Sequence, residues 1–310
     1  MENSFVVSTL TAAIRSGTPL LFAVLGDILT ERTGVMNLGI EGLMLVGAIG
    51  GFFTSYLTGN LLLAVIVAMV AGALLASVHA FFTITLKINQ IVSGLAITFL
   101  GTGISGIWGA NYVGIVAEKF DPVKIPLLGD IPYIGKIMFN QDLLVYISYL
   151  LVPILFIYIY RTKSGMILRA VGESPRAADS RGISVTKTRY IYTIAGGALT
   201  AVGGAYLSLA YNSMWIEDMT AGKGWIAVAL VLFATWDPAK AMLGAYLFGG
   251  ITALGLRLQA IGTHISSDFL KMLPYILTVI VLLFTSTEKL KRKVGAPEAL
   301  GIPYSREDRE

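Results

Sequence analysis

Nine stretches of the sequence are almost entirely apolar, and most of them approach the roughly 20 residues that a helix needs to cross a bilayer. With 55% hydrophobic and only 14% charged residues and a mean hydropathy of +0.74, the chain of 310 residues has too little polar surface for a soluble protein. We therefore predict an all-α polytopic membrane protein with about nine (eight to ten) transmembrane helices. The apolar runs are residues 5–25, 38–57, 61–86, 91–110, 143–160, 190–211, 225–236, 241–260 and 269–285.

Lysine and arginine accumulate in two places, and cytoplasmic loops of membrane proteins retain an excess of these residues. Seven basic residues lie in the loop 161–189, and four more follow the last apolar run at Lys289, Lys291, Arg292 and Lys293. We therefore predict a transmembrane domain at 1–287 with a cytoplasmic loop at 161–189, and a cytoplasmic C-terminal tail at 288–310. Alternation then places the loop 111–142 outside. The net charge of +4 reflects this topology and does not indicate nucleic-acid binding.

The side of the N-terminus depends on the number of crossings. Nine crossings place it outside, whereas a break or re-entry of the chain at residues 33–42 places it in the cytoplasm. We favour the cytoplasmic placement, because charges, glycines and an asparagine separate the first two apolar runs in this region.

The loop 161–189 contains the signals of a short capped helix. Ser174 suits the N-cap, Pro175 the first helical position and Gly182 the residue just past the end. The pattern predicts about two helical turns between two spans. By itself it fits a docking element and a solvated connecting helix equally well.

The segment 30–42 places polar groups next to the membrane. We expect Asn37 to cap a helix that starts at Leu38, whose free N–H groups would face a polar solute. Glu41 lies one turn inside this helix, and a carboxylate at membrane depth costs about 3 kcal/mol, so it should face the bundle interior or a pathway. The alternative is a cytoplasmic turn with ordinary caps. Asp27 and Glu31 share one helix face near the same turn.

Glycines recur within the predicted spans, at Gly101, Gly103 and Gly106, at the pairs 196–197 and 203–204, and at 249–250. Small residues let helix backbones approach closely in lipid, so a tightly packed bundle is expected. Residues 91–108 and 225–236 both follow a polar stretch and end in tryptophan. We interpret this similarity as a sign of inverted repeats.

Motifs for catalysis and for metal binding are missing from the sequence. There is no cysteine, no P-loop and no H-E-x-x-H or G-x-S-x-G motif, and His79 stands alone in its span, which favours a structural histidine. We therefore predict that the chain is not an enzyme and itself binds no cofactor or metal. Energy for transport against a gradient must come from a partner or from a coupled ion.

Three segments together carry a family resemblance: residues 31–42 (Glu-Arg-Thr-Gly-Val-Met-Asn-Leu-Gly-Ile-Glu-Gly), residues 89–94 (Asn-Gln-Ile-Val-Ser-Gly), and the loop from 169–173 through 182–183. Over nearly its whole length the chain resembles permease subunits of ABC importers of the branched-chain amino acid and simple-sugar superfamily. It is most similar to the smaller permease of nucleoside importers that work with basic-membrane-protein-type lipoproteins.

This resemblance implies an ABC importer permease fold in a prokaryotic plasma membrane, with translocation by alternating access. The implied partners are a second, longer permease, a cytoplasmic ATP-binding subunit that holds ATP and Mg, and an external substrate-binding lipoprotein. The substrate would be a nucleoside. Ribose or another simple sugar is the alternative within the class. An ion-coupled secondary carrier that uses Asp27, Glu31 and Glu41 is the alternative outside it.

The resemblance also assigns roles to residues. The loop helix becomes the coupling helix that docks on the ATPase, with Arg176 and Arg181 for polar contacts and Ala177 and Ala178 for close approach. Asn37 and Glu41 become polar groups beside the substrate pathway. The coupling helix comprises Ser174, Pro175, Arg176, Ala177, Ala178, Asp179, Arg181 and Gly182.

Overall fold

The computed structural model describes residues 2–261, 266–285 and 295–306, and within them every predicted apolar run forms a helix. The long helices are α1 (Glu2–Glu31), α2 (Ile40–Thr58), α3 (Leu61–Ala80), α4 (Gln90–Gly109), α6 (Leu143–Arg161), α9 (Val185–Tyr206), α10 (Lys223–Ala234), α11 (Pro238–Ala260) and α12 (Ser267–Thr285). The π-helical turns η1 (Phe81–Thr85) and η4 (Leu207–Tyr211) extend α3 and α9.

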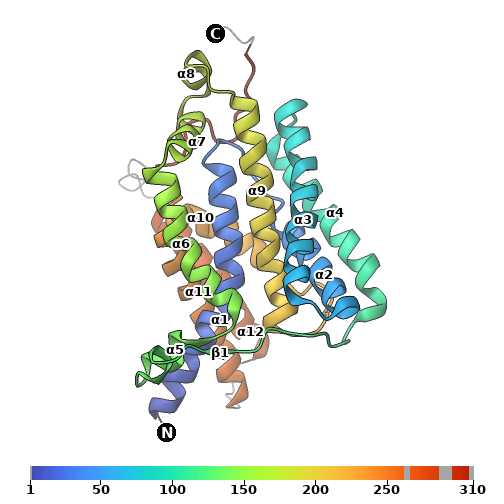
Figure 1. The fold of residues 1–310 in the computed structure, drawn as a ribbon, viewed down its shortest axis with the longest axis vertical. Helices are drawn as coiled ribbons and strands as arrows, with labels where there is room; N and C mark the ends of the chain where they lie inside the picture. Colours follow the sequence, from blue (N-terminus) through green and yellow to red (C-terminus); the bar gives the residue numbers. More distant parts are fainter. Residues whose placement is uncertain (1, 262–265, 286–294, 307–310) are drawn as a thin grey trace.

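Shorter elements lie at the two ends of the bundle (Figure 1). We use "the α8 end" for the end with α7 (Lys163–Glu173), α8 (Pro175–Ser180) and the C-terminus. We use "the α5 end" for the opposite end, where the loop 111–142 and the N-terminus lie. That loop contains η2 (Ala110–Tyr112), β1 (Val123–Lys124), η3 (Leu128–Asp130), α5 (Ile134–Met138) and β2 (Asn140–Gln141), and its two strands pair antiparallel.

The favoured placement of the N-terminus beside the C-terminus is wrong. α1 is one continuous helix of 30 residues, and near its start the Thr11 hydroxyl donates a hydrogen bond to the Lys136 carbonyl at the α5 end. Its other end reaches the α8 end, where the Gly301 amide donates to the Gly34 carbonyl. The chain breaks at residues 32–39 only after it has crossed the bundle, so the start of α1 and the described C-terminal residues lie at opposite ends of the bundle.

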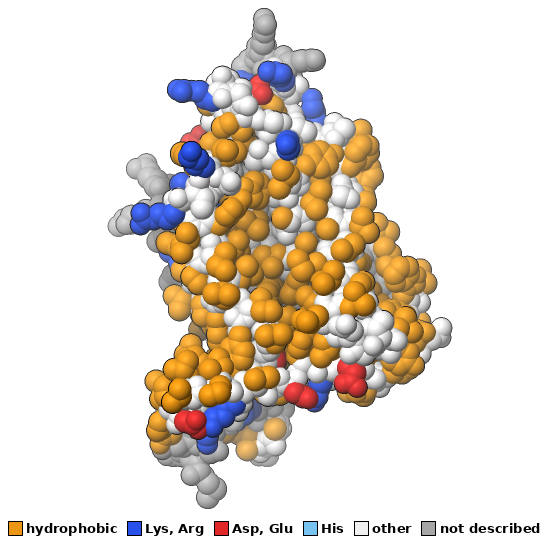
Figure 2. Space-filling view, in the orientation of Figure 1, with side chains coloured by type: hydrophobic (Ala, Val, Ile, Leu, Met, Phe, Trp, Pro, Cys, Tyr) orange, Lys and Arg blue, Asp and Glu red, His pale blue; other side chains and the backbone are white. Residues whose placement is uncertain are grey.

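Within the residues that the structure describes, the number of full spans is smaller than the expected nine. In the part of the chain that the structure describes, seven helices are long and apolar enough to cross a membrane. α10 has only 12 residues, about 18 Å of helix, and covers part of the bilayer thickness. α12 has 19 residues. Figure 2 shows apolar side chains over the long middle of the molecule and charged side chains at its two ends, as expected for a bundle in lipid.

α1 and α9 form the centre of the bundle. In the most apolar 18-residue stretch of α1, 89% of the residues are buried inside the protein. In the corresponding stretch of α3, on the outside of the bundle, only 28% are buried. Glycines allow this close packing. A Cβ atom at Gly196 would lie 2.4 Å from the Gly26 carbonyl oxygen of α1, and one at Gly204 would lie 1.8 Å from the Met44 carbonyl oxygen of α2. The predicted role of the paired glycines in α9 is confirmed.

The glycines of α4 divide into two kinds, which gives a matched stability test. A Cβ at Gly101 would lie 2.4 Å from the Gly42 carbonyl oxygen, whereas none of the described atoms lies within 4 Å of one at Gly103. We expect Gly101→Ala to push α4 from α2 and to destabilise the protein by about 1–3 kcal/mol, as overpacking does. Gly103→Ala should not destabilise it. Thermal unfolding of the two purified variants tests this, and equal midpoints would refute the assigned crossing.

Candidate functional site

The short helix predicted in the basic loop is present as α8. The Ser174 hydroxyl caps it by accepting a hydrogen bond from the Ala177 amide at 3.4 Å, Pro175 is its first residue, and Gly182 beyond its end has φ +80°. These are the local signals that the sequence carried. α8 protrudes at the extreme of the α8 end, next to the C-terminal segment (Figure 1).

The side chains of α8 divide between the outside and the inside. Arg176, Ala177 and Arg181 are exposed. Ala178 is only 3% exposed and packs in a small apolar cluster with Val171, Ile183, Val185 and Tyr304. Of the two alanines expected to admit a partner, Ala178 therefore faces inward and only Ala177 faces outward.

The described part of the C-terminal tail, residues 295–306, lies against the α8 end of the bundle, and we call it the C-terminal segment. The Ala299 amide donates a hydrogen bond to the Gly172 carbonyl, and the Gly301 amide donates to the Gly34 carbonyl. Arg306 pairs with Asp179 of α8 at 3.0 Å. The sequence indicated only a tail here; residues 286–294 and 307–310, which include Lys289 to Lys293, lie outside the described residues.

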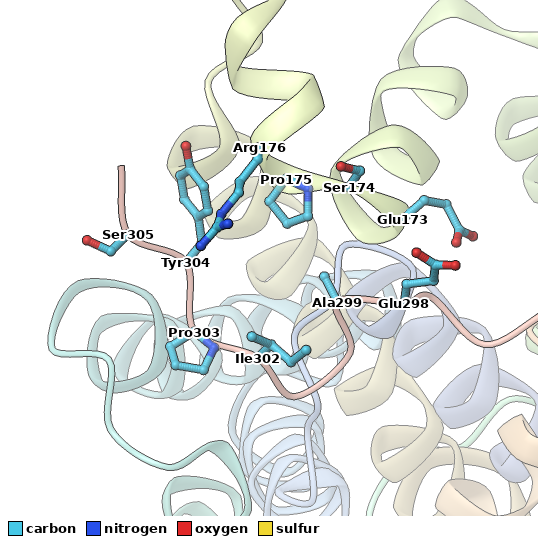
Figure 3. Close-up of a pocket in the computed structure, with 10 residues that line it drawn as sticks. All are labelled: Glu173, Ser174, Pro175, Arg176, Glu298, Ala299, Ile302, Pro303, Tyr304 and Ser305. Carbon is cyan, nitrogen blue, oxygen red and sulfur yellow. The ribbon is translucent and has the colours of Figure 1, made fainter. Parts of the chain in front are cut away.

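A cavity of about 290 Å³ lies between α8 and the C-terminal segment. In Figure 3, Arg176 and Tyr304 lie side by side at one end of it, and Glu173 and Glu298 lie together at the other. Desolvation, together with a hydrogen bond to Asp179, raises the pKa of Tyr304 above its ordinary value. The α8 end thus has a basic exposed helix beside a mixed-charge groove.

Irregular backbone at residues 32–39 connects α1 to α2, and many of its polar groups form hydrogen bonds within the bundle. The Asn37 side chain accepts a hydrogen bond from the Gly39 amide at 2.9 Å and is 1% exposed. α2 begins at Ile40 with Gly39 as its N-cap, and no side chain caps it. The expected cap at Asn37 and helix start at Leu38 are therefore wrong: Asn37 stabilises the turn before the helix.

Glu41, in the first turn of α2, is 5% exposed and binds the start of α10. Its carboxylate accepts hydrogen bonds from the Thr220 hydroxyl at 2.6 Å, the Gly222 amide at 2.8 Å and the Gly224 amide at 2.5 Å. The positive end of the α10 dipole adds to these charge-assisted bonds. Glu41 therefore faces the bundle interior, as the sequence predicted, and there it holds the irregular segment before α10 in place.

Asp27 and Glu31, near the end of α1, differ from each other in their hydrogen bonding. Glu31 accepts a hydrogen bond from the Trp236 indole at 2.7 Å, just past α10. Asp27 is 1% exposed, and neither of its carboxyl oxygens has a hydrogen-bond partner among the described residues. A buried polar group without a partner is uncommon and calls for a physical reason.

His79 is the structural histidine that its isolation in the sequence predicted. Its Nδ1 lies 2.9 Å from the Ser93 hydroxyl and its Nε2 lies 3.1 Å from the Met36 carbonyl oxygen. Among the described residues no three histidine or acidic side chains gather as a metal site would require.

Comparisons with known proteins agree on one class. Residues 9–282 match the family model described as the permease component of the branched-chain amino acid transport system. A candidate glucose ABC transporter permease protein of Haloferax volcanii is 39% identical over 98% of this chain and 99% of its own. The guanosine ABC transporter permease protein NupQ of Bacillus subtilis is 35% identical over 92% of each chain. A second guanosine permease of that bacterium, NupP, is 24% identical over 90% of this chain and 84% of its own.

A solved structure shares the fold. A candidate metal-chelate type ABC transporter in an inward-facing conformation aligns with a TM-score of 0.52 over 89% of this chain and 85% of its own, at 15% identity. At this identity the likeness concerns the arrangement of helices alone.

Proposed function

Because the chain belongs to the permease components of the branched-chain amino acid transport system family, we propose that it is the transmembrane subunit of an ATP-driven nucleoside importer. A permease of this class is not catalytic itself, and ATP hydrolysis takes place in a partner ATPase. In the proposed mechanism, ATP binding and hydrolysis with Mg in that partner bias two packings of the bundle, which expose the substrate to alternate sides.

The observation that carries the coupling proposal is α8. It is a capped helix that exposes Arg176 and Arg181 at the end of the molecule where the basic loop and the C-terminal segment meet. A short rigid element at this position suits the transmission of a movement from an ATPase to α7 and α9 on either side of it. Ser174 to Gly182 is therefore the proposed coupling helix.

The proposed complex contains four kinds of subunit: this chain, a second and longer permease, a cytoplasmic ATP-binding subunit and an external substrate-binding lipoprotein. Two related guanosine permeases in one bacterium support a pair of different permeases. The complex would lie in a prokaryotic plasma membrane, with the C-terminus of this chain in the cytoplasm.

Asn37 and Glu41 are the proposed polar groups next to the substrate pathway. Both are buried in the bundle, where α2 meets irregular backbone and the start of α10. Because the Glu41 carboxylate already accepts three hydrogen bonds, we propose that it shapes the pathway by holding α10 in place. It would not bind the substrate with a free carboxylate.

The substrate proposal is tested by competition. Cells that express the whole transporter take up labelled guanosine, and an excess of unlabelled nucleosides, ribose or glucose is added. Nucleosides should compete, and the sugars should not. The sugar alternative, which the similarity to the Haloferax protein supports, would be established if the same cells took up labelled glucose or ribose and no labelled guanosine.

The buried Asp27 carboxyl group, which has no hydrogen-bond partner among the described residues, favours a second candidate function, that of an ion-coupled carrier. Such carriers use buried acidic residues as ion-binding sites. The neutral isostere Asp27→Asn distinguishes the two mechanisms. In an ATP-driven permease it removes no hydrogen bond that the described residues make, so uptake should stay within about twofold of the wild type. A carrier that depends on ion binding at Asp27 should instead lose gradient-driven uptake, and that result would favour the second candidate.

A further inference from the structure

We propose that the C-terminal segment is a strap that ties α8 to the α1–α2 junction, with Arg189 as its positioning residue, so that movement of α8 reaches the core of the permease. This inference rests on the proposed function of α8 as the coupling helix. It adds a second route between α8 and the bundle besides the chain connections through α7 and α9.

One part of the strap binds the α7–α8 unit. Tyr304 packs against the buried face of α8 at Ala178, and Arg306 pairs with Asp179 on the same helix. The Ala299 amide donates its hydrogen bond to Gly172, near the end of α7. These contacts hold the strap to α8. Arg176 lies beside Tyr304 of the strap (Figure 3), and Arg181 lies at the other end of α8, where it is exposed.

The other part of the strap binds the α1–α2 junction. Arg189 of α9 is 1% exposed, and it donates from Nε to the Thr33 carbonyl at 3.2 Å and from Nη1 to the Ile302 carbonyl at 3.1 Å. The Gly301 amide donates directly to the Gly34 carbonyl. Arg32 donates from Nη1 to the Gly295 carbonyl at 3.2 Å. Two buried or nearly buried arginines thus bind carbonyl groups on the strap, and Arg189 joins it to the junction.

The backbone segments at the α1–α2 junction are closely packed. A Cβ atom at Gly172 would lie 2.1 Å from the Arg32 carbonyl oxygen, and Gly34 and Gly301 both have positive φ, at +87° and +77°. The backbones of the strap and of the α1–α2 junction are in direct contact here, so a displacement of one of these two segments must displace the other. Beyond the junction, residues 35–39 lead to Glu41 and so to the start of α10, which completes a contiguous route from α8 to the bundle interior.

Truncation tests the strap. In the assembled transporter, we expect deletion of residues 295–310 to leave the ATPase bound but to lower the solute imported per ATP hydrolysed by about tenfold, a usual size for coupling between sites. Deletion of 307–310 alone is the matched control and should have no effect. A normal ratio of import to hydrolysis in the longer deletion would overturn the proposal.

Arg189→Gln gives a second variant in which the chain keeps its full length. It removes two of the charge-assisted hydrogen bonds at the junction. The solute imported per ATP hydrolysed should therefore fall, while the ATPase copurifies at the wild-type level. Arg189→Lys keeps the charge and should restore part of the import per ATP hydrolysed. If Arg189→Gln transports at the normal ratio, the strap has no coupling role even where the truncated protein does not accumulate.

Cysteine pairs test whether the strap stays bound during transport, and the natural chain contains no cysteine that would interfere. Ala178→Cys with Tyr304→Cys should form a disulfide and keep uptake, whereas Ala177→Cys with Tyr304→Cys should not crosslink, because Ala177 faces outward. Loss of uptake on crosslinking the first pair, with recovery on reduction, would contradict a strap that moves with α8. Loss of ATPase copurification on charge reversal of α8 tests the coupling helix separately.

Discussion

Charge reversal at both exposed arginines of α8, Arg176→Glu with Arg181→Glu, is expected to abolish copurification of the ATPase with the permease. Each change replaces a cation with an anion on the proposed docking surface, and like charges at an interface cost several kcal/mol. We expect binding to weaken by about 100-fold or more. Pull-down of the ATPase on the solubilised permease measures it directly.

A control of equal charge is available at the same end of the molecule. Lys163→Glu with Lys187→Glu changes the net charge by the same amount at two exposed positions outside α8. This control should retain the ATPase. If the α8 variant also retains it, α8 is a connecting helix; if both variants lose it, overall charge and not α8 determines binding.

Glu41→Gln is expected to reduce uptake by about tenfold or more while the complex remains assembled. The carboxylate accepts three hydrogen bonds from the segment before α10 and from its first turn. The amide of glutamine offers one acceptor oxygen and turns an N–H group toward donors, so at least one charge-assisted hydrogen bond, worth about 1.5–3 kcal/mol, is lost. Labelled uptake, with the amount of recovered complex, is the measurement.

Glu217→Gln is the matched control, because Glu217 is an exposed acid in the same loop that leads to α10. It should transport normally. Normal uptake by Glu41→Gln would show that the hold of Glu41 on α10 does not matter for translocation, and the proposed role of Glu41 would be rejected.

Features that depend on neighbouring residues in the sequence were predictable. The apolar runs form helices because lipid requires every backbone polar group to be paired within its own segment. α8 follows from Ser174, Pro175 and Gly182, whose effects are local. The burial of Glu41 agrees with its position inside the apolar run 38–57, although a cytoplasmic turn was the alternative.

Features that depend on distant residues were not predictable in the same way. The partners of Glu41 lie about 180 positions away, at Thr220 to Gly224, in a segment without periodicity. The C-terminal segment binds largely through its backbone carbonyl and amide groups, which leave no trace in side-chain pattern. One of the predicted spans is only half-length, because α10 is apolar but has 12 residues, and an apolar run alone does not reveal where irregular backbone shortens a helix.

The most direct test of an ATP-driven permease is uptake of labelled guanosine by cells that express this chain with its proposed partners, with and without the ATPase subunit. Uptake should vanish without the ATPase and should survive a protonophore while ATP is maintained. Uptake that persists without the ATPase and collapses with the ion gradient would contradict the ATP-driven mechanism and establish an ion-coupled carrier.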